Sequence, residues 1–251
     1  MAAKAAWPSA PAARARRTRV LVTALVVLVL AAAALVALIE TGVIGSQGVS
    51  AEELTRVALI AAAPDETGAV IAQVIVLVDV SKQPAEVTYL NPATPVTITG
   101  TSFNTLADAY PFGGGAGVAD AIARAGKVPG EAPAYVAVGP EALAEAVDAA
   151  GGLTFRLPAD MAVFDGETLF TFRPGRRAFS AAELTAVFKG APYLKPEERA
   201  ELDEELGRAF AALLAEWPDA GLQQTAENAD IDTDISPDAL TTLAEALTAL
   251  P

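Results

Sequence analysis

The chain has 251 residues, a net charge of −14, and neither cysteine nor histidine. Those two absences exclude a zinc site with thiolate or imidazole ligands, a disulfide frame, and a Ser-His or Cys-His catalytic pair. Carboxylates, hydroxyls, lysine and arginine remain as the reactive groups. The cofactor that stays open is a carboxylate-bound hard cation such as magnesium, and neither haem nor a nucleotide is expected.

The charge is unevenly distributed along the chain. Residues 1–19 contain five basic residues and no acid, which leaves a net charge of −19 for residues 20–251. Nucleic acids bind basic surfaces, because each phosphate that is contacted must be neutralised. The larger part of the chain is therefore not expected to bind nucleic acid.

The first element in chain order is an apolar run at residues 20–39, in which Thr23 is the polar exception. Twenty residues of helix span about 30 Å, which is the thickness of the hydrocarbon core of a bilayer. The basic residues before the run favour a cytoplasmic N-terminus. We predict a cytoplasmic tail over 1–19, a transmembrane helix over 20–39, and a single-pass plasma membrane protein with its C-terminal domain outside.

A cleaved signal peptide is the main alternative to this anchor. Val49-Ser50-Ala51 contains small residues typical of a cleavage site, but it lies about ten residues beyond the apolar run. The run is also longer than the usual 7–15 residues of a signal core. A buried soluble helix is a third option. In the first two cases the domain is exported, with residues 40–50 as a Gly- and Ser-containing linker and 51–251 as the extracytoplasmic domain.

Runs of β-branched residues and helix signals alternate in the exported domain. The run at 70–80 is nearly continuous in Val and Ile, as expected for a strand buried on both faces. Ser180 and Glu183 form a capping box that opens a helix. We expect strands over 54–62, 70–80, 85–90, 134–138, 153–157 and 168–172, a loop or edge strand over 91–101, and helices over 116–125, 140–150, 181–188, 196–216 and 237–250.

The order of these elements predicts an α/β (α+β) domain with a central mixed β-sheet flanked by helices. Two short motifs each have a functional interpretation and a plain structural one. The glycine-rich segment 113–117 could hold a phosphate, but it lacks the spacing and lysine of a P-loop, so a turn is favoured. Alternating Asp230, Asp232 and Asp234 could ligate calcium, but they lack the glycine and terminal glutamate of an EF-hand, which favours a solvated stretch before the last helix.

Four of the basic residues in this domain lie in a short strand-rich region: Arg156, Arg173, Arg176 and Arg177. The guanidinium fork matches the oxygens of phosphate and carboxylate groups. The cluster could therefore form an anion site, or it could pair with the many acids of the domain.

Several segments resemble motifs of the LytR-CpsA-Psr (LCP) family. The segment LADAYPFGG at 106–114 resembles N-A-A-Y-x-x-G-G, and AYVAV at 134–138 resembles Y-V-x-V. The segment VDAAGGL at 147–153 matches V-D-A-x-G-G-V, and LPADM at 157–161 is similar to V-P-x-x-M. The stretch from 170 to 179 is similar to L-x-x-G-x-x-x-L. The resemblance covers residues 54–250, and its specific part lies at 106–180.

The resemblance implies an LCP-like fold and a role in the cell envelope. Members of this family transfer glycopolymers from a polyprenyl-pyrophosphate carrier to peptidoglycan or a related wall acceptor, usually with magnesium. Arginines hold the pyrophosphate and aspartates hold the metal. On this basis the partners would be the membrane, a lipid-linked glycopolymer and peptidoglycan.

This chain departs from the family at the charged positions. The segment YLNPAT at 89–94 stands where the family has S-I-P-R-D, Gln73 replaces an aspartate, and Ala107 replaces an asparagine. Lys189 stands for the first arginine of V-R-x-R, and the second is absent. Candidate pyrophosphate ligands are Lys189, Arg199, Arg173, Arg177 and Arg208, and no catalytic residue is assigned.

Three functional hypotheses remain open at this point. The first is a divergent, active glycopolymer transferase that uses those basic residues. The second, which the missing charges favour, is a non-catalytic relative that binds a lipid-linked polymer or a partner protein at the envelope. A third hypothesis is an exported ligand-binding domain whose likeness to the family is coincidental.

Overall fold

The computed structural model describes residues 48–216 and 230–250. The predicted cytoplasmic tail, the transmembrane helix and all but the end of the linker lie outside the described residues. Within the described ranges, no helix has the length and apolar character needed to cross a bilayer.

A five-stranded mixed sheet forms the centre of the domain, in the order β3-β2-β1-β4-β9. β1 pairs antiparallel with β2 and parallel with β4, and the two outer strands β3 and β9 pair antiparallel with their neighbours. The bounds are β1 Arg56–Pro64, β2 Val70–Asp79, β3 Glu86–Leu90, β4 Ala134–Val138 and β9 Ile231–Thr233.

Apolar side chains fill both faces of the sheet. Along β1, Val57 and Leu59 point into one core, and Ala58 and Ile60 point into the other. Alternate residues of a strand point to opposite faces, so a strand that is covered on both sides must be apolar at nearly every position. This explains the continuous apolar runs of β1 and β2.

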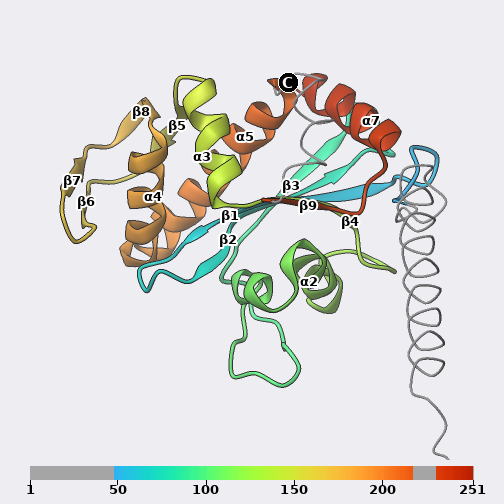
Figure 1. The fold of residues 1–251 in the computed structure, drawn as a ribbon, viewed down its shortest axis with the longest axis horizontal. Helices are drawn as coiled ribbons and strands as arrows, with labels where there is room; N and C mark the ends of the chain where they lie inside the picture. The colour runs from blue at the N-terminus through green and yellow to red at the C-terminus, as the bar shows by residue number, and fades with distance from the viewer. Residues whose placement is uncertain (1–47, 217–229, 251) are drawn as a thin grey trace, which may run out of the picture. The chain divides into compact units, whose positions relative to one another are not determined.

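Helices cover both faces of the sheet (Figure 1). On one face lie α3 (Pro140–Ala149), α4 (Ala181–Gly190), α5 (Pro196–Glu216) and α7 (Pro237–Thr248). On the other face lies α2 (Tyr110–Arg124), preceded by the short η1 (Ala107–Ala109). A second short helix, η2 (Ala191–Tyr193), connects α4 to α5. The three-layer arrangement and mixed sheet confirm the predicted fold class.

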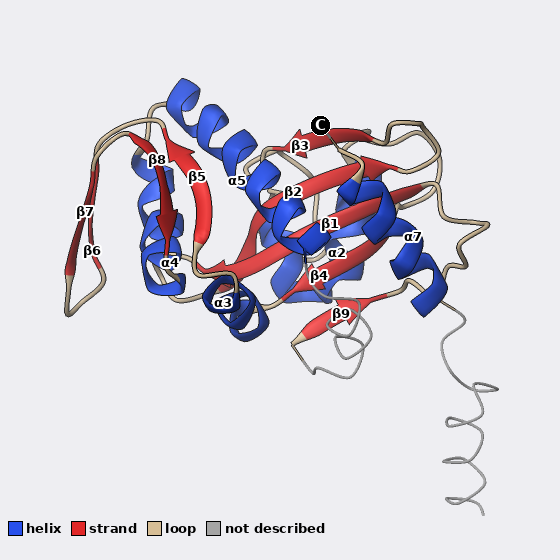
Figure 2. Cartoon of the chain, turned by 90° about the horizontal axis from the view of Figure 1, so that it is seen from above, coloured by secondary structure: helices blue, strands red, loops and turns tan. Residues whose placement is uncertain are grey.

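Two small antiparallel sheets extend beyond the central one (Figure 2). β5 (Leu153–Leu157) pairs with β8 (Gly175–Phe179), and β6 (Met161–Phe164) pairs with β7 (Leu169–Phe172) as a hairpin. Phe155 and Phe179 stack with ring centroids 4.1 Å apart, and Phe172 meets Phe179 edge-on. This aromatic cluster fixes the small sheets against the helices.

The elements of the structure agree with the sequence predictions in some segments and differ from them in others. The strands at 134–138 and 153–157, the helix at 196–216 and the capping box at Ser180 are confirmed. β6, β8 and β9 were not predicted. The interpretation of residues 230–234 as a solvated stretch was wrong, because residues 231–233 form an edge strand of the central sheet.

The prediction that the glycine segment interrupts the chain before a helix is confirmed. Gly113 and Gly114 have non-helical φ and ψ and form a kink inside α2, where Gly114 has φ +56°. Glycine adopts this left-handed conformation without the cost that a Cβ would add. A short helical stretch from Tyr110, which was not predicted, precedes the kink, and helical geometry resumes after Gly114, close to the predicted start at residue 116.

Candidate functional site

An apolar groove of about 580 Å³ lies between β3, α5 and α7. Its volume falls within the roughly 300–1,000 Å³ that is usual for small-molecule sites. β3 contributes Val87 and Tyr89, and α5 contributes three alanines to the wall. The residues that line it are Ala85, Glu86, Val87, Tyr89, Arg208, Ala211, Ala212, Ala215, Leu247, Thr248 and Leu250.

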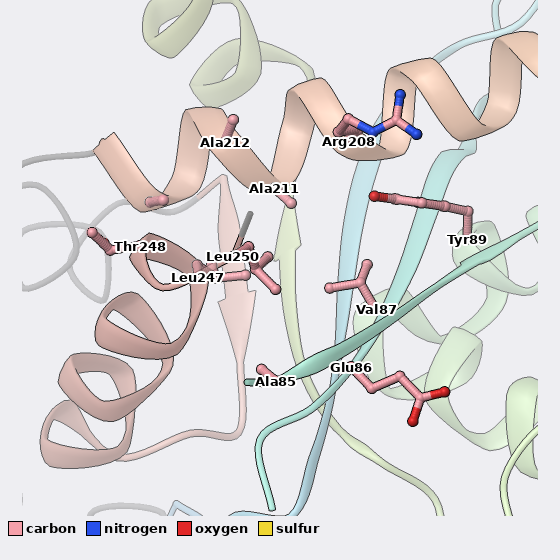
Figure 3. Close-up of a pocket in the computed structure, with 11 residues that line it drawn as sticks. Ala85, Glu86, Val87, Tyr89, Arg208, Ala211, Ala212, Leu247, Thr248 and Leu250 are labelled. Carbon is pink, nitrogen blue, oxygen red and sulfur yellow. The ribbon is translucent and has the colours of Figure 1, made fainter. Parts of the chain in front are cut away.

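The groove has a polar end and an apolar end (Figure 3). Arg208 lies above the Tyr89 ring at one end, and Leu247 and Leu250 lie at the other. The side chain of Glu86 points away from the space between them. The arrangement suits a ligand that is mainly apolar and carries a polar group at one end.

The sequence of α5 accounts for the shape of the groove. A Cβ at Gly207 would overlap the Tyr89 ring and lie 3.2 Å from Val76, so glycine lets the helix approach β3 closely there. One turn later the helix presents Ala211, Ala212 and Ala215 to the groove. Their methyl groups leave space that larger side chains would fill, so a groove remains beside the tightly packed glycine.

The charge at the polar end is already balanced. Arg208 donates to Glu204 Oε1 and to Glu205 Oε1, both at 2.7 Å, and its guanidinium carbon lies 5.9 Å from the centre of the Tyr89 ring. Burial raises the pKa of the Tyr89 phenol, so this group stays neutral. With two carboxylates on one guanidinium, this end of the groove carries no excess positive charge.

Arg199 lies earlier on α5, where its Nε donates to Asp203 Oδ1 at 2.7 Å. Both side chains are mostly buried, with 18% and 7% of their surface exposed. Asp203 Oδ2 is buried without a hydrogen-bond partner among the described residues. Burial raises the pKa of Asp203, and the adjacent arginine offsets this only in part.

Lys189 lies near the end of α4, where it lines a separate pocket of about 500 Å³. Hydrogen bonds from the Thr168 and Glu167 amides lower the pKa of Asp165, and the positive charge of Lys189 adds to that effect. Lys189 therefore lies close enough to Asp165 to affect its ionisation, and it lines a different pocket from Arg208.

The arginines of the small sheets are exposed. Arg177 forms an ion pair with Glu183 and lies over the Phe179 ring, 4.8 Å from its centre. Arg156 forms an ion pair with Glu201 at 3.2 Å. Arg173 and Arg176 are solvent-exposed, and neither has an ion pair within the described ranges.

The structure therefore does not gather the five candidate ligands around one cleft. Arg208 lines the groove, Lys189 lines the second pocket, and Arg199 lines neither and is paired with Asp203 on α5. Sequence reasoning missed the groove, because alanines on α5 and leucines at the end of α7 carry no functional signal by themselves.

Asp232 in β9 and the flanking Asp230 and Asp234 accept hydrogen bonds from neighbouring elements. Asp232 accepts from the Gly115 amide at 2.9 Å and from the Tyr135 hydroxyl at 3.0 Å, and Asp234 accepts from the Tyr135 amide at 2.7 Å. Asp230 accepts from the Ala142 amide at 2.8 Å, at the start of α3. In residues 48–216 and 230–250 no three acidic side chains are grouped so that they could hold a metal ion.

Comparisons by sequence give no relative for the chain. No protein-family model matches it, and no curated protein matches its sequence.

Solved structures share its fold, however. Protein gbs0355 of Streptococcus agalactiae superposes with a TM-score of 0.55 at 16% identity, over 77% of this chain and 74% of that one. B. subtilis TagV gives 0.54 at 14% identity, over 77% and 79%. A LytR-Csp2A-Psr enzyme from Actinomyces oris gives 0.54 at 16% identity, over 77% and 75%. The chain has an LCP-like fold, which confirms the resemblance first found in its motifs.

Proposed function

We propose that this chain is a cell-envelope protein that binds a lipid-linked glycopolymer and does not transfer it. The apolar groove between β3, α5 and α7 carries this proposal, because it could take part of a polyprenyl chain. The shared fold with a LytR-Csp2A-Psr enzyme supports the link to wall glycopolymers. A fold alone does not determine a function, so the argument rests on the groove.

The energetics favour a hydrocarbon ligand in this groove. Each CH₂ group that leaves water contributes about 0.8 kcal/mol, so a few isoprene units can provide substantial affinity. The walls are methyl groups of Ala211, Ala212 and Val87, together with Leu247 at the end of α7 and Leu250 just after it. A volume of about 580 Å³ suits one segment of a long polyprenyl chain rather than all of it.

The charges argue against transfer of the polymer. Each group that stabilises charge in a transition state is worth about 10²–10³ in rate, and it must be free to meet the phosphate. Arg199 and Arg208 are held by carboxylates on their own helix, and Lys189 lies at another pocket. A pyrophosphate at Arg208 would also meet Glu204 and Glu205. Binding of the lipid portion without group transfer is consistent with all of these features.

The predicted membrane anchor is part of this proposal. Residues 20–39 would keep the domain beside the outer surface of the plasma membrane, where a polyprenyl carrier has its tail, with residues 1–19 in the cytoplasm. The end of the bound glycopolymer that is distant from the lipid would then face peptidoglycan. Magnesium has no role in this mode of binding.

Two measurements on the full chain in phospholipid nanodiscs test the proposal. Incubation with a polyprenyl-pyrophosphate-linked disaccharide and magnesium is expected to release no lipid pyrophosphate or phosphate. Affinity for a fluorescent polyprenyl phosphate is expected to fall at least tenfold in Ala212→Trp, which fills the groove. Ala200→Trp is the matched control, because Ala200 is an exposed alanine of α5 that does not line the groove. Turnover in the first assay would support the transferase instead, and equal affinity in both variants would refute the groove as the lipid site.

A further inference from the structure

The second pocket, which contains Lys189, is chemically different from the groove. It is formed by the turn between β1 and β2, the β6–β7 hairpin and the end of α4, and its volume is about 500 Å³. Glu66 and Thr67 come from the turn, and Phe164 and Asp165 come from the hairpin. Aromatic rings and charged groups therefore share one small space on the surface.

Two aromatic residues of this pocket are unusually exposed. Phe164 has 65% of its surface accessible and Tyr193 has 78%. Aromatic side chains are normally at least half buried, because they bring a large apolar area. The Tyr193 hydroxyl donates to Glu66, which holds the phenol ring at the pocket although solvent surrounds it. Two exposed rings at a single pocket indicate a ligand with a flat apolar face.

The polar groups of the pocket provide both donors and acceptors. The hydrogen bonds that Asp165 accepts from backbone amides end on Oδ1, at 2.9 and 2.8 Å, which leaves Oδ2 as an acceptor. Glu66 accepts the hydrogen bond of the Tyr193 hydroxyl through Oε2, which leaves Oε1 as an acceptor for a ligand. The Lys189 ammonium brings three N–H donors. A hydroxyl group both donates and accepts, so a ligand with several hydroxyls matches this set.

The charge of the pocket excludes a phosphate as its main ligand. Glu66 and Asp165 bring two negative charges and Lys189 brings one positive charge, so the pocket has a net charge of −1. Anions are repelled by such a site, and phosphates are normally bound by arginine forks or free backbone amides. A neutral, polyhydroxylated ring is the ligand class that fits the aromatic rings, the hydrogen-bonding groups and the charge together.

We propose that this pocket binds a neutral pyranose ring of the glycan, with the ring's C–H face against Phe164 or Tyr193 and its hydroxyls on Asp165, Glu66 and Lys189. This inference rests on the proposed function, since it assigns the sugar part of the glycopolymer to a site of its own. Lipid and sugar would then be held at two separate pockets of one domain.

The test uses the full chain and three soluble probes: tetramers of β-1,4-linked N-acetylglucosamine, β-1,4-linked glucose and α-1,4-linked glucose. Binding is measured by ligand-observed NMR. At least one probe is expected to bind with millimolar affinity, and Phe164→Ala and Tyr193→Ala should each weaken it about tenfold. Inorganic pyrophosphate should not compete.

Leu169→Ala is the matched control. Leu169 is the cross-strand partner of Phe164 and is equally exposed at 64%, but it does not line the pocket. It should therefore leave sugar binding unchanged while weakening the hairpin to a similar degree. Equal losses in Phe164→Ala and Leu169→Ala, or no binding of any probe, would overturn the inference.

The same variants separate this inference from the proposed function. Polyprenyl phosphate affinity should be unchanged in Phe164→Ala, because the groove is elsewhere. Lipid binding without sugar binding would refute the sugar pocket and keep the lipid groove. Sugar binding with the expected loss in Phe164→Ala, but without lipid binding, would support the pocket and refute the groove.

Discussion

Two glycines of α2, Gly113 and Gly115, differ in how much space is available for a side chain. A Cβ at Gly115 would overlap the Tyr135 ring and lie 2.9 Å from the Ala137 Cβ, whereas one at Gly113 would meet nothing within 4 Å. Gly115 directly follows the family-like segment at 106–114, and Tyr135 belongs to the family-like segment at 134–138. The contact between them has a structural role, since glycine at this position lets α2 lie directly on β4.

Gly115→Ala is expected to destabilise the domain by about 1–3 kcal/mol, because an added methyl group in a full contact forces backbone or ring to move. Gly113→Ala is the control and should change stability by about 0.5 kcal/mol at most. Urea denaturation of the two variants measures the difference. Equal midpoints would show that the helix can shift away from Tyr135 without cost.

Asp203 is a mostly buried carboxyl group whose ionisation is affected by burial. Burial raises its pKa above the ordinary value of 3.8, so the folded state binds this proton more readily than the unfolded state does. Because the pKa of this group is higher in the folded state, the free energy of unfolding falls as pH rises from the pKa of the unfolded state through that of the folded state. The ionised carboxylate then has one oxygen on Arg199 and one without a partner.

Asp203→Asn removes this titration. Relative to that variant, the wild-type chain should lose stability as pH rises from below 4 toward neutrality, as followed by urea midpoints across that range. Glu204→Gln serves as the control, because Glu204 is on the same helix and 56% of its side chain is exposed. A wild-type chain that gains stability relative to Asp203→Asn over the same range would contradict the assignment.

At the scale of elements, β9 and the residue before it position two helices through their carboxylates. Asp232 binds the Gly115 amide just after the kink in α2, and Asp230 binds the Ala142 amide in the first turn of α3. Carboxylates are favourable at helix N-termini, where backbone amides lack partners. A three-residue strand that sequence patterns did not reveal thus positions one helix on each face of the sheet.

Removing one of these caps should loosen its helix. Asp232→Ala frees the Gly115 amide and the Tyr135 hydroxyl, and we expect a loss of about 1 kcal/mol in unfolding free energy, since the carboxylate is partly exposed. Asp232→Asn keeps an acceptor and should lose less. Hydrogen exchange at the Gly115 amide checks the cause, and an unchanged exchange rate in Asp232→Ala would contradict it.

At the scale of the whole domain, the sequence predicts the central sheet well, because β1, β2 and β4 must be apolar to be covered on both faces. It does not predict β8 or β9, because their arginines and aspartates hide the strand pattern. The groove depends on contacts of β3 with α5 and the end of α7, and β3 precedes both helices by more than 100 residues along the chain. No local pattern could reveal the groove. Of the five charged candidate ligands, Arg208 lines it and the other four lie elsewhere.

The central claim is that the groove holds the lipid of a lipid-linked glycopolymer. It is tested most directly by photo-crosslinking the full chain, in nanodiscs, to a polyprenyl phosphate that carries a diazirine in its tail. The account predicts crosslinked peptides from β3, from the Arg208–Ala215 part of α5 and from the end of α7, with their yield abolished in Ala212→Trp and retained in Ala200→Trp. Crosslinks confined to other parts of the domain would contradict it.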